Sequence, residues 1–425
     1  MKIRINNGKL IDPANSLYST GTVCIEDGLI ISAGKPSARF KPDVEIDAND
    51  KWVCPGIIDL CGRFGEPGQE FKATIESESN AAASAGVTAV CCPPDTQPVI
   101  DTPAVVELIH QRAEKANRTH LYPIAALTQG LEGERLAELY TLKQAGCIAA
   151  SNANFPVSNN EILRRAMEYA ASTDMTVFIH AQDHFLANNG VVNEGAISTR
   201  LGLPPIPETA ETVAVSTALL LIEQTKVKAH FCRLSSAKSV EMIARAKKAG
   251  LPVSADVSIC HLHLTEMDVD GYNTKCHLVP PLRTLEDKNA LIQGLVSGAI
   301  DAVCSDHQPH NEDAKTAPFS LTKPGASTIE ILLPMVLDLV SKDLLTPIRA
   351  IECLTINPAR ILGIDSGSLA VGKIADITII DPEKSWSFTK EQMISAGKNT
   401  PFDEWELFGK VTHTIYKGQV VYQTK

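Results

Sequence analysis

The central part of the chain alternates short apolar runs with longer amphipathic stretches. The apolar runs have the length and composition of buried strands, and they span 52–60, 86–92, 120–127, 146–150, 174–180, 227–232, 251–257 and 299–305. Helical spacing of apolar residues is clearest in 102–116, 158–172, 207–225 and 236–249. Strands that are each followed by a helix predict an α/β fold, namely a (β/α)8 TIM-type barrel. A doubly wound open sheet is the alternative.

Both ends of the chain differ from this middle, because they are rich in strand-like runs and turn residues. Asp27-Gly28 is a hairpin signal between two apolar runs near the N-terminus. Near the C-terminus, 375–380 and 411–416 have the composition of strands. We therefore expect one small composite β-sandwich built from both termini. The expected division is 1–53 and 366–425 for the sandwich, and 54–365 for the barrel.

Composition narrows the class of protein. The 425 residues carry a formal net charge of -11, which argues against a nucleic-acid partner because such a partner needs a basic face. The 11 cysteines include no C-x-x-C pair, which is typical of reduced thiols in a cytoplasmic protein. The first residues alternate like a strand rather than a signal peptide, and the apolar stretch 331–340 is too short to span a membrane. We expect a soluble cytoplasmic protein without a membrane partner.

The barrel prediction indicates where a site would lie, since barrel enzymes place their active sites at the C-terminal ends of the strands. Most of the side chains expected at those ends are polar or charged. In chain order they are Cys61, Arg63, Asp95, Asn152, Ala153, His180, Arg233, His261 and Asp306.

Several different short motifs lie at these strand ends and in the loops that follow them. They are Pro55-Gly56-Ile57-Ile58-Asp59, Glu66-Pro67-Gly68-Gln69-Glu70, His180-Ala181-Gln182-Asp183, Asn193-Glu194-Gly195, Pro280-Pro281-Leu282-Arg283 and Ser305-Asp306-His307-Gln308-Pro309-His310. Over essentially its whole length the chain resembles the dihydroorotases of the amidohydrolase superfamily. The resemblance implies a barrel with a β-sandwich, and hydrolysis or closure of a cyclic amide with zinc.

The resemblance also implies a set of zinc ligands, and most of them are missing here. The family has His-x-His after strand 1, a bridging carboxylate after strand 4, a histidine after strands 5 and 6, and an aspartate after strand 8. In this chain only His180 and Asp306 keep the expected residue type. The other ligand positions hold Cys61, Arg63, Asn152 with Ala153, and Arg233.

The positions that the resemblance assigns to substrate binding differ as well. Gly65 stands where the family has an arginine, Asp95 where it has an asparagine, and Val279 where it has another asparagine. His261 and His310 match family positions, and we interpret them as residues that form hydrogen bonds within loops.

Electrostatics argues against zinc between these residues. An arginine about 4 Å from a dication costs roughly 8 kcal/mol at an effective dielectric constant near 20, and arginine stays protonated. We therefore expect no zinc and no other cofactor, with His180 and Asp306 as vestiges of the site. Because a carboxylate at the barrel mouth needs a partner, we expect Asp306 to pair with Arg63 or Arg233.

Two functions follow from the resemblance. One branch of the family consists of inactive chains that bind aspartate carbamoyltransferase and help to assemble it in pyrimidine biosynthesis. The chain resembles this branch, which implies a pseudoenzyme, not an enzyme, that self-associates within a hetero-oligomer containing aspartate carbamoyltransferase. The alternative is a metal-dependent cyclic-amide hydrolase, a dihydroorotase or a related amidohydrolase, with a remodelled mononuclear site at Cys61, His180 and Asp306.

Overall fold

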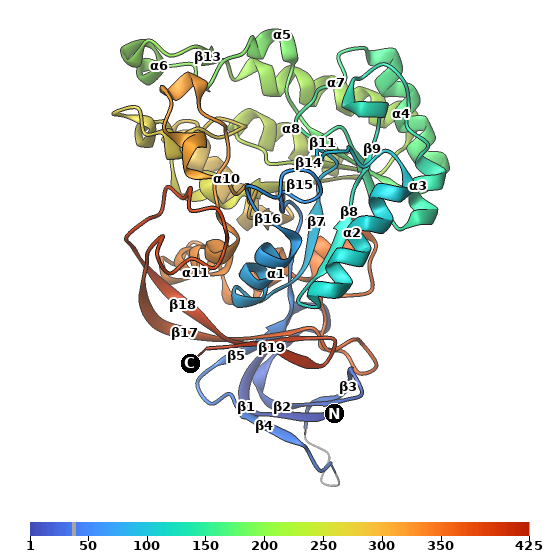
Figure 1. Cartoon of the computed structure of the whole chain (residues 1–425), viewed down its shortest axis with the longest axis vertical. Helices are drawn as coiled ribbons and strands as arrows, with labels where there is room; N and C mark the ends of the chain where they lie inside the picture. The colour runs from blue at the N-terminus through green and yellow to red at the C-terminus, as the bar shows by residue number, and fades with distance from the viewer. Residues whose placement is uncertain (36–39, 425) are drawn as a thin grey trace.

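The computed structural model describes residues 1–35 and 40–424, and both ends of the chain meet in one sheet (Figure 1). The sheet order is β19-β18-β17-β5-β1-β2-β3, with β4 paired to β1. Its strands are β1 (Lys2–Asp12), β2 (Leu17–Glu26), β3 (Leu29–Gly34), β4 (Val44–Asp47), β5 (Trp52–Pro55), β17 (Ile377–Phe388), β18 (Trp405–Tyr416) and β19 (Gln419–Gln423).

The two termini share one apolar core in this sheet. Ile5 and Ile25 from the N-terminal strands are fully buried with Ile377 and Ile415 from the C-terminal strands. Burying a side chain of this size contributes roughly 1.5–3 kcal/mol, so neither terminal segment can form its core without the other. The boundaries at 53 and 365, and the division of these strands into a sandwich, stay predictions.

The middle of the chain forms parallel strands in two sheets, ordered β6-β7-β8 and β9-β10-β11-β14-β15-β16. Their bounds are β6 (Ile57–Asp59), β7 (Val87–Cys92), β8 (His120–Pro123), β9 (Ala125–Ala126), β10 (Ala149–Ser151), β11 (Thr176–His180), β14 (Ala229–Cys232), β15 (Val253–Ser258) and β16 (Ala302–Cys304). A separate short pair joins β12 (Val192–Asn193) to β13 (Pro205–Ile206).

Helices alternate with the parallel strands, so the predicted α/β class is confirmed. The four helical stretches expected from the sequence are present as α2, α4, α7 and α8. The helices are α1 (Ile75–Ser84), α2 (Pro103–Ala116), α3 (Leu139–Ala145), α4 (Asn160–Ser172), α5 (His184–Ala187), α6 (Ala196–Leu201), α7 (Thr209–Thr225), α8 (Ala237–Lys248), α9 (Ile259–His263), α10 (Leu285–Ser297), α11 (Leu332–Ser341), α12 (Pro347–Leu354) and α13 (Ile356–Leu362).

The predicted strand 52–60 is two strands in two different sheets, because the chain turns at Gly56. Residues up to Pro55 pair with β17, whereas Ile57 onward pairs with β7. The Gly56 amide donates to the Asp376 carbonyl at 2.8 Å. A side chain at this position would meet Thr88 Oγ1 of β7 at 2.0 Å, so any larger residue would force Thr88 or the turn to shift.

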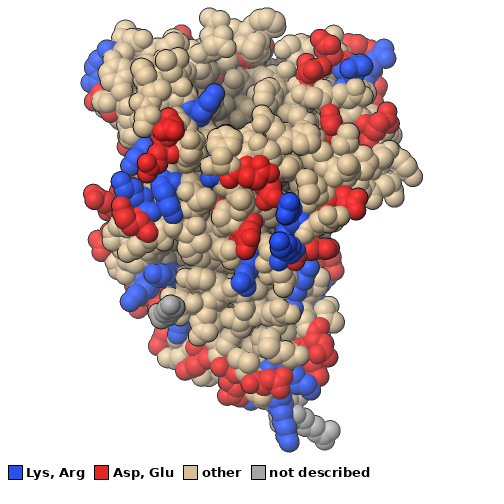
Figure 2. Space-filling view, viewed as in Figure 1, with Lys and Arg blue, Asp and Glu red and all other residues tan. Residues whose placement is uncertain are grey.

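Charged side chains of both signs are interspersed over the face shown in Figure 2, and no large basic patch appears on it. Among the described residues, no helix combines the length and the apolar character that crossing a membrane requires.

The contact at Gly56 gives a stability prediction. Gly56→Ala should lower the free energy of unfolding by about 1–3 kcal/mol, because the added methyl group overlaps the buried Thr88 side chain. Thr88→Ala in the Gly56→Ala background should recover part of this loss, and urea denaturation of the four proteins of the cycle measures both effects. A Gly56→Ala protein as stable as the wild type would contradict the packing argument.

Candidate active site at the strand ends

Asp306 follows β16 and is the centre of a buried ion cluster. Its Oδ1 accepts hydrogen bonds from Arg233 Nη1 at 2.8 Å and from Arg63 Nη1 at 3.4 Å. Arg63 also donates through Nε to Asp95 Oδ2 at 2.8 Å. The pairing expected of Asp306 is therefore present with both arginines, and two carboxylates balance two guanidinium groups.

The backbone around Arg233 explains how a long cationic side chain is held at 4 % exposure. Arg233 lies just after β14 with φ 54, and its amide donates to Asp256 Oδ1 at 2.5 Å. Its Nη2 donates to Asn154 Oδ1 at 2.7 Å. Because these contacts fix both ends of the residue, the guanidinium group is directed onto Asp306.

Asp59 joins the first and last parallel strands beneath this cluster. Its Oδ1 accepts from the amides of Ser305 at 2.9 Å and Cys61 at 3.3 Å, and its Oδ2 accepts from the Ser305 hydroxyl. Burial raises the pKa of Asp59 to about 6, although the hydrogen bonds from Ser305 and Cys61 lower it. The carboxyl group therefore ties the segment that carries Arg63 to the segment that carries Asp306.

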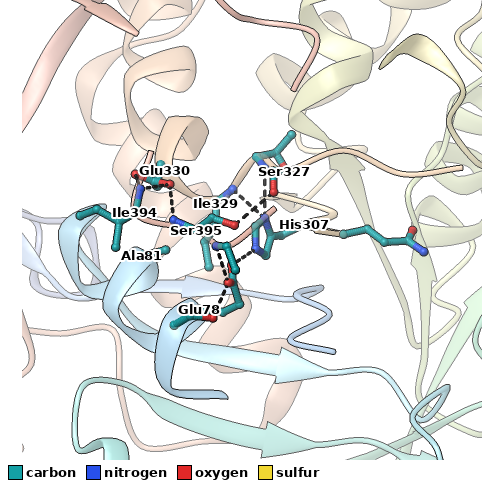
Figure 3. Close-up of polar contacts among 12 residues, drawn as sticks. Glu78, Ala81, His307, Ser327, Ile329, Glu330, Ile394 and Ser395 are labelled. Carbon is teal, nitrogen blue, oxygen red and sulfur yellow. Dashed lines mark hydrogen bonds and ion pairs between the residues drawn. The ribbon is translucent and has the colours of Figure 1, made fainter. Parts of the chain in front are cut away.

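His307, next to Asp306, is fixed by the contacts drawn in Figure 3. Its Nδ1 accepts from the amide of Thr328 at 3.0 Å, so the proton lies on Nε2, which donates to Glu78 Oε2 at 2.7 Å. Burial raises the pKa of Glu78, but hydrogen bonds from His307 and other donors outweigh it and bring the pKa below its usual value. A charged carboxylate bonded to a neutral imidazole thus anchors the loop after β16.

The same region ties the loop to the C-terminal segment. Glu78 Oε1 accepts from the Ala396 amide at 3.0 Å, and Glu330 accepts from the amides of Ile394 and Ser395 (Figure 3). Glu78, which is buried, and Glu330, which is partly buried, therefore satisfy backbone donors of a segment that lies between β17 and β18.

Cys61 and His180 lie close to the ion cluster without carrying charge. The Cys61 thiol donates to Asp306 Oδ1 at 3.5 Å, and burial raises its pKa far above the ordinary value, so it remains a thiol. Burial, Arg233 and Arg63 together lower the pKa of His180 well below its usual value, which leaves a neutral imidazole. Neither ring nitrogen of His180 has a hydrogen-bond partner among the described residues.

His180 lines a cavity of about 140 Å³ at the ends of β10 and β11. Apolar and polar groups share its wall, among them Phe155, Phe178 and Thr217. Phe185, which follows the strand end in α5, is 77 % exposed and stands at this cavity. The cavity therefore offers a half-apolar space beside an unpartnered imidazole.

Asn152 and Ala153 also line this cavity, but neither offers a free metal ligand. Asn152 Oδ1 accepts from Thr128 Oγ1 at 2.8 Å, and its Nδ2 donates to the carbonyls of Leu131 and Phe155. The amide is thus used to hold loops, and Ala153 carries no donor atom. Asn152 and Ala153 therefore occupy the position of the bridging carboxylate without supplying a metal ligand.

The remaining predicted residues shape the surroundings. Gly65 has φ +76, and a side chain there would stand 2.7 Å from the Ala73 carbonyl, so glycine is required by the turn. His261 bonds through Nε2 to the Pro281 carbonyl, and His310 bonds likewise to that of Pro324. Both histidines hold loops, as interpreted from the sequence, and burial lowers the pKa of His310 to about 4. Val279 has no polar side-chain atom.

The strand-end residues do not fit the zinc centre that the resemblance implies. Two guanidinium groups converge on the one remaining carboxylate, and a dication at that place would meet both of them. The thiol of Cys61 donates to the same oxygen. Cys61, His180 and Asp306, the mononuclear set considered above, do not come together as ligands among the described residues.

A different cluster, which the sequence analysis missed, has the donor set for a metal. His230, Cys232 and Asp256 bring one nitrogen, one sulfur and one oxygen ligand atom within 4.8 Å of one another. His, Cys and Asp are ligands that zinc uses in proteins. The alternation of β14 places His230 and Cys232 on one face, and Asp256 lies on the neighbouring β15. That spacing, two residues apart in a strand, is the signal that could have revealed the cluster.

Comparisons with known proteins agree with the whole-length resemblance. The family described as Dihydro-orotase-like matches residues 50–239, and the one described as Amidohydrolase family matches 341–422. A dihydroorotase-like protein of Pseudomonas aeruginosa is 44% identical over 423 residues, covering 100% of both chains. A dihydroorotase of Syntrophotalea carbinolica is 41% identical, covering 100% of this chain and 99% of its own.

Among solved structures, L-hydantoinase (dihydropyrimidinase) from Arthrobacter aurescens has the same fold, with a TM-score of 0.89 at 22% identity. The match covers 99% of this chain and 96% of that chain. A D-hydantoinase matches with a TM-score of 0.85 and 22% identity over 100% of this chain and 95% of that chain.

Two predictions are wrong in the light of these findings. The pseudoenzyme prediction is contradicted, because proteins named dihydroorotase match the chain end to end. That prediction rested on the zinc ligands missing from one set of positions, and those positions do not show whether the relatives are enzymes. The prediction of no metal cofactor is contradicted as well, because the chain matches the Amidohydrolase family and His230, Cys232 and Asp256 form a candidate metal site. By relatives that match over its full length, the chain belongs to the dihydroorotase-like proteins of the amidohydrolase superfamily.

Proposed function

We propose that the chain is a cyclic-amide hydrolase of the dihydroorotase type, and that it binds its substrate at the strand ends. The observation that carries the proposal is the full-length similarity to proteins named dihydroorotase. The half-apolar cavity lined by His180 supports it, because a small cyclic amide needs such a space. Asp306, which follows the last parallel strand, adds an oriented carboxylate that can act in acid–base chemistry.

The proposal includes a closed (β/α)8 barrel as the scaffold of the site. Contacts where the two sheets meet support closure. The chain runs from β8 through Ile124 directly into β9, and the Ile124 amide donates to the Cys92 carbonyl of β7 at 2.9 Å. At the other edges Gly62 and His307 form a bridge, and the His307 amide donates to the Cys61 carbonyl at 3.2 Å. Closure brings Arg63 and Asp306, which are far apart in sequence, to one mouth.

The residues of this chain perform the acid–base work in the proposed reaction. Water adds to the ring carbonyl carbon, the carbon–nitrogen bond of the ring breaks, and the proton lost by water ends on the departing nitrogen. Asp306 accepts and returns that proton, while Arg63 and Arg233 keep its carboxylate in one orientation. The neutral His180 offers a hydrogen bond to the bound ring.

A metal ion, where the chain binds one, fits His230, Cys232 and Asp256 better than the strand-end residues. As a Lewis acid it would supply polarisation of an oxygen ligand. Asp256 also accepts the Arg233 amide at 2.5 Å, so the cluster adjoins the strand-end site through the backbone.

Ring opening tests the proposal directly. The purified chain, supplied with zinc, should interconvert dihydroorotate and its open carbamoyl amino acid, and Asp306→Asn should lower the rate about 10²–10⁴-fold. Absorbance of the ring amide measures both directions. The control is Arg164→Gln, which removes only exposed contacts to Glu161 and Glu168 and should leave the rate unchanged. No conversion by the folded wild-type chain would overturn the proposal.

Metal content gives an independent test of the second cluster. The wild-type chain should bind one zinc ion per molecule, measured by elemental analysis after dialysis, with a higher melting temperature than the metal-free form. Cys232→Ser should lose most of the bound metal, whereas Cys61→Ser should keep it. Equal zinc content in Cys232→Ser and wild type would exclude the cluster as the site.

A second candidate function is association with aspartate carbamoyltransferase, which the sequence suggested. Exposed apolar side chains on the outer helices support it. Val213 and Leu220, one heptad apart on α7, are 42% and 67% exposed, and Leu285 and Val296 are exposed on α10. Contiguous apolar patches mark surfaces that contact another protein, and the seven-residue spacing puts Val213 and Leu220 on one face of α7. This role is compatible with hydrolase activity in the same chain.

Co-expression tests the association. The two chains should co-purify and show the mass of a hetero-oligomer in light scattering, because a permanent interface buries roughly 2,000 Å² or more. Leu220→Glu should weaken the complex at least about tenfold, whereas Val371→Glu, a matched change at an exposed apolar residue near β17, should not. Two independent masses in the mixture of wild-type chains would refute the association.

A further inference from the structure

We infer that Glu211 is a positioning residue of the strand-end site, which acts by holding the loop 233–236 so that Arg233 points at Asp306. The inference rests on the proposed function, because it names what aligns the arginine that orients the acid–base carboxylate. Glu211 lies in the first turn of α7, and its hydrogen bonds run to that loop.

The loop has to be held, because Arg233 has an unfavourable backbone conformation. Its φ is 54, in the left-handed region, which a residue with a side chain adopts only where the surrounding structure imposes it. Asp256 fixes the near side, since its side chain accepts the Arg233 amide and its carbonyl accepts the Leu234 amide at 3.0 Å. The contacts beyond Leu234 therefore decide whether the far side of the loop is held as well.

Glu211 holds the far side. Its Oε1 accepts from the amides of Ser235 and Ser236, both at 3.1 Å, and its Oε2 accepts from the Ser235 hydroxyl. Ser236 is the N-cap of α8, so the carboxylate also lies at the positive end of that helix. One carboxylate thus fixes the two residues that follow Leu234.

A buried cation compensates this carboxylate. Arg283, which is buried like Glu211, donates through Nε to Ser235 Oγ at 3.1 Å. The serine hydroxyl therefore connects a buried carboxylate to a buried guanidinium group. Buried charges persist when hydrogen bonds and an opposite charge compensate them, and removal of one partner leaves the other without compensation.

The same contacts explain two sequence motifs that the acid–base chemistry leaves unused. Arg283 is the last residue of the motif 280–283, and its Nη1 donates to Asn193 Oδ1 at 2.8 Å. Asn193 is the first residue of the motif 193–195. Because Arg283 also contacts Ser235, both motifs converge on the loop that Glu211 holds.

Chemical labelling tests the positioning without any turnover. Phenylglyoxal modifies accessible arginine side chains, and peptide mass spectrometry locates each modified residue. Glu211→Gln keeps the shape of the side chain but replaces one accepting oxygen by a donor. Arg233, which is buried, should be labelled at least about tenfold faster in this variant than in the wild type, because the loop opens more often. Exposed Arg165 should be labelled equally in both proteins. An unchanged rate at Arg233 would overturn the inference.

A double-mutant cycle separates positioning from a general effect on the fold. Glu211→Gln should lower kcat about 10²-fold with little change in KM, because a small misplacement of a reacting group has an effect of this size. In the Arg233→Lys background the same change should have little further effect, since the contact that it aligns is already altered. Equal losses in both backgrounds would overturn the inference, because they would show that Glu211 acts independently of Arg233.

The matched control is Glu208→Gln. Glu208 lies three residues before Glu211 and pairs with exposed Lys238, so its replacement should change neither the labelling of Arg233 nor the rate.

Arg283→Lys serves as a second variant where Glu211→Gln fails to fold. It keeps the charge but cannot contact Ser235 and Asn193 together, so it should release the same loop and speed the labelling of Arg233. Full protection of Arg233 in folded Arg283→Lys would overturn the inference.

The inference and the hydrolase proposal fail in different measurements. Faster labelling of Arg233 in Glu211→Gln, combined with a wild-type chain that does not convert dihydroorotate, would overturn the hydrolase proposal alone. Conversion of dihydroorotate by Glu211→Gln at the wild-type rate would overturn this inference alone.

Discussion

The ion cluster of Arg63, Arg233 and Asp306 is the interaction on which the strand-end site depends. A carboxylate at 9% exposure and a guanidinium group at 4% exposure are stable there only because each neutralises the other. Removal of one partner would leave a buried charge without compensation, which typically costs 3–5 kcal/mol. The cluster is thus a structural constraint as well as a chemical one.

Further polar contacts connect the segments that carry the cluster to the rest of the fold. Asp59 connects the segments that carry Arg63 and Asp306, and Glu78 holds His307 next to Asp306. Each of these groups sits on a different sequence segment, so the site is rigid only when the first and last parallel strands are adjacent. Contacts between the segments that follow the first and last parallel strands therefore hold the site together.

Much of the fold could be predicted from the sequence, because it depends on the spacing of apolar residues and on the turn residues between apolar runs. The expected strands of the middle region are present within a few residues, since buried parallel strands read as continuous apolar runs, although 52–60 and 120–127 are each divided between two sheets. The break at Gly56 escaped this pattern, because the run stays apolar across the turn and only the contact with Thr88 shows why glycine stands there. Periodicity carries no information about a close approach to a distant residue.

The site was predicted unevenly for the same reason. The positions of Arg63, Arg233 and Asp306 at strand ends predicted that they belong to the site. Their opposite charges alone predicted that they pair. Asp256 on the neighbouring β15 and Asn154 in the loop after β10 orient Arg233 through hydrogen bonds that no local pattern reveals. The expectation of no metal failed because it examined only the positions set by resemblance, whereas His230 and Cys232 lie deeper on β14.

The two charged regions of the site are coupled through Asp256. One of its oxygens accepts the Arg233 amide, and the other bonds to His230 at 2.9 Å. A cation held by His230, Cys232 and Asp256 would bind the same carboxylate that orients the Arg233 backbone. Its positive charge would repel the Arg233 guanidinium group. Such a cation would raise the positive potential at the strand ends, where Arg63 and Arg233 already converge on Asp306.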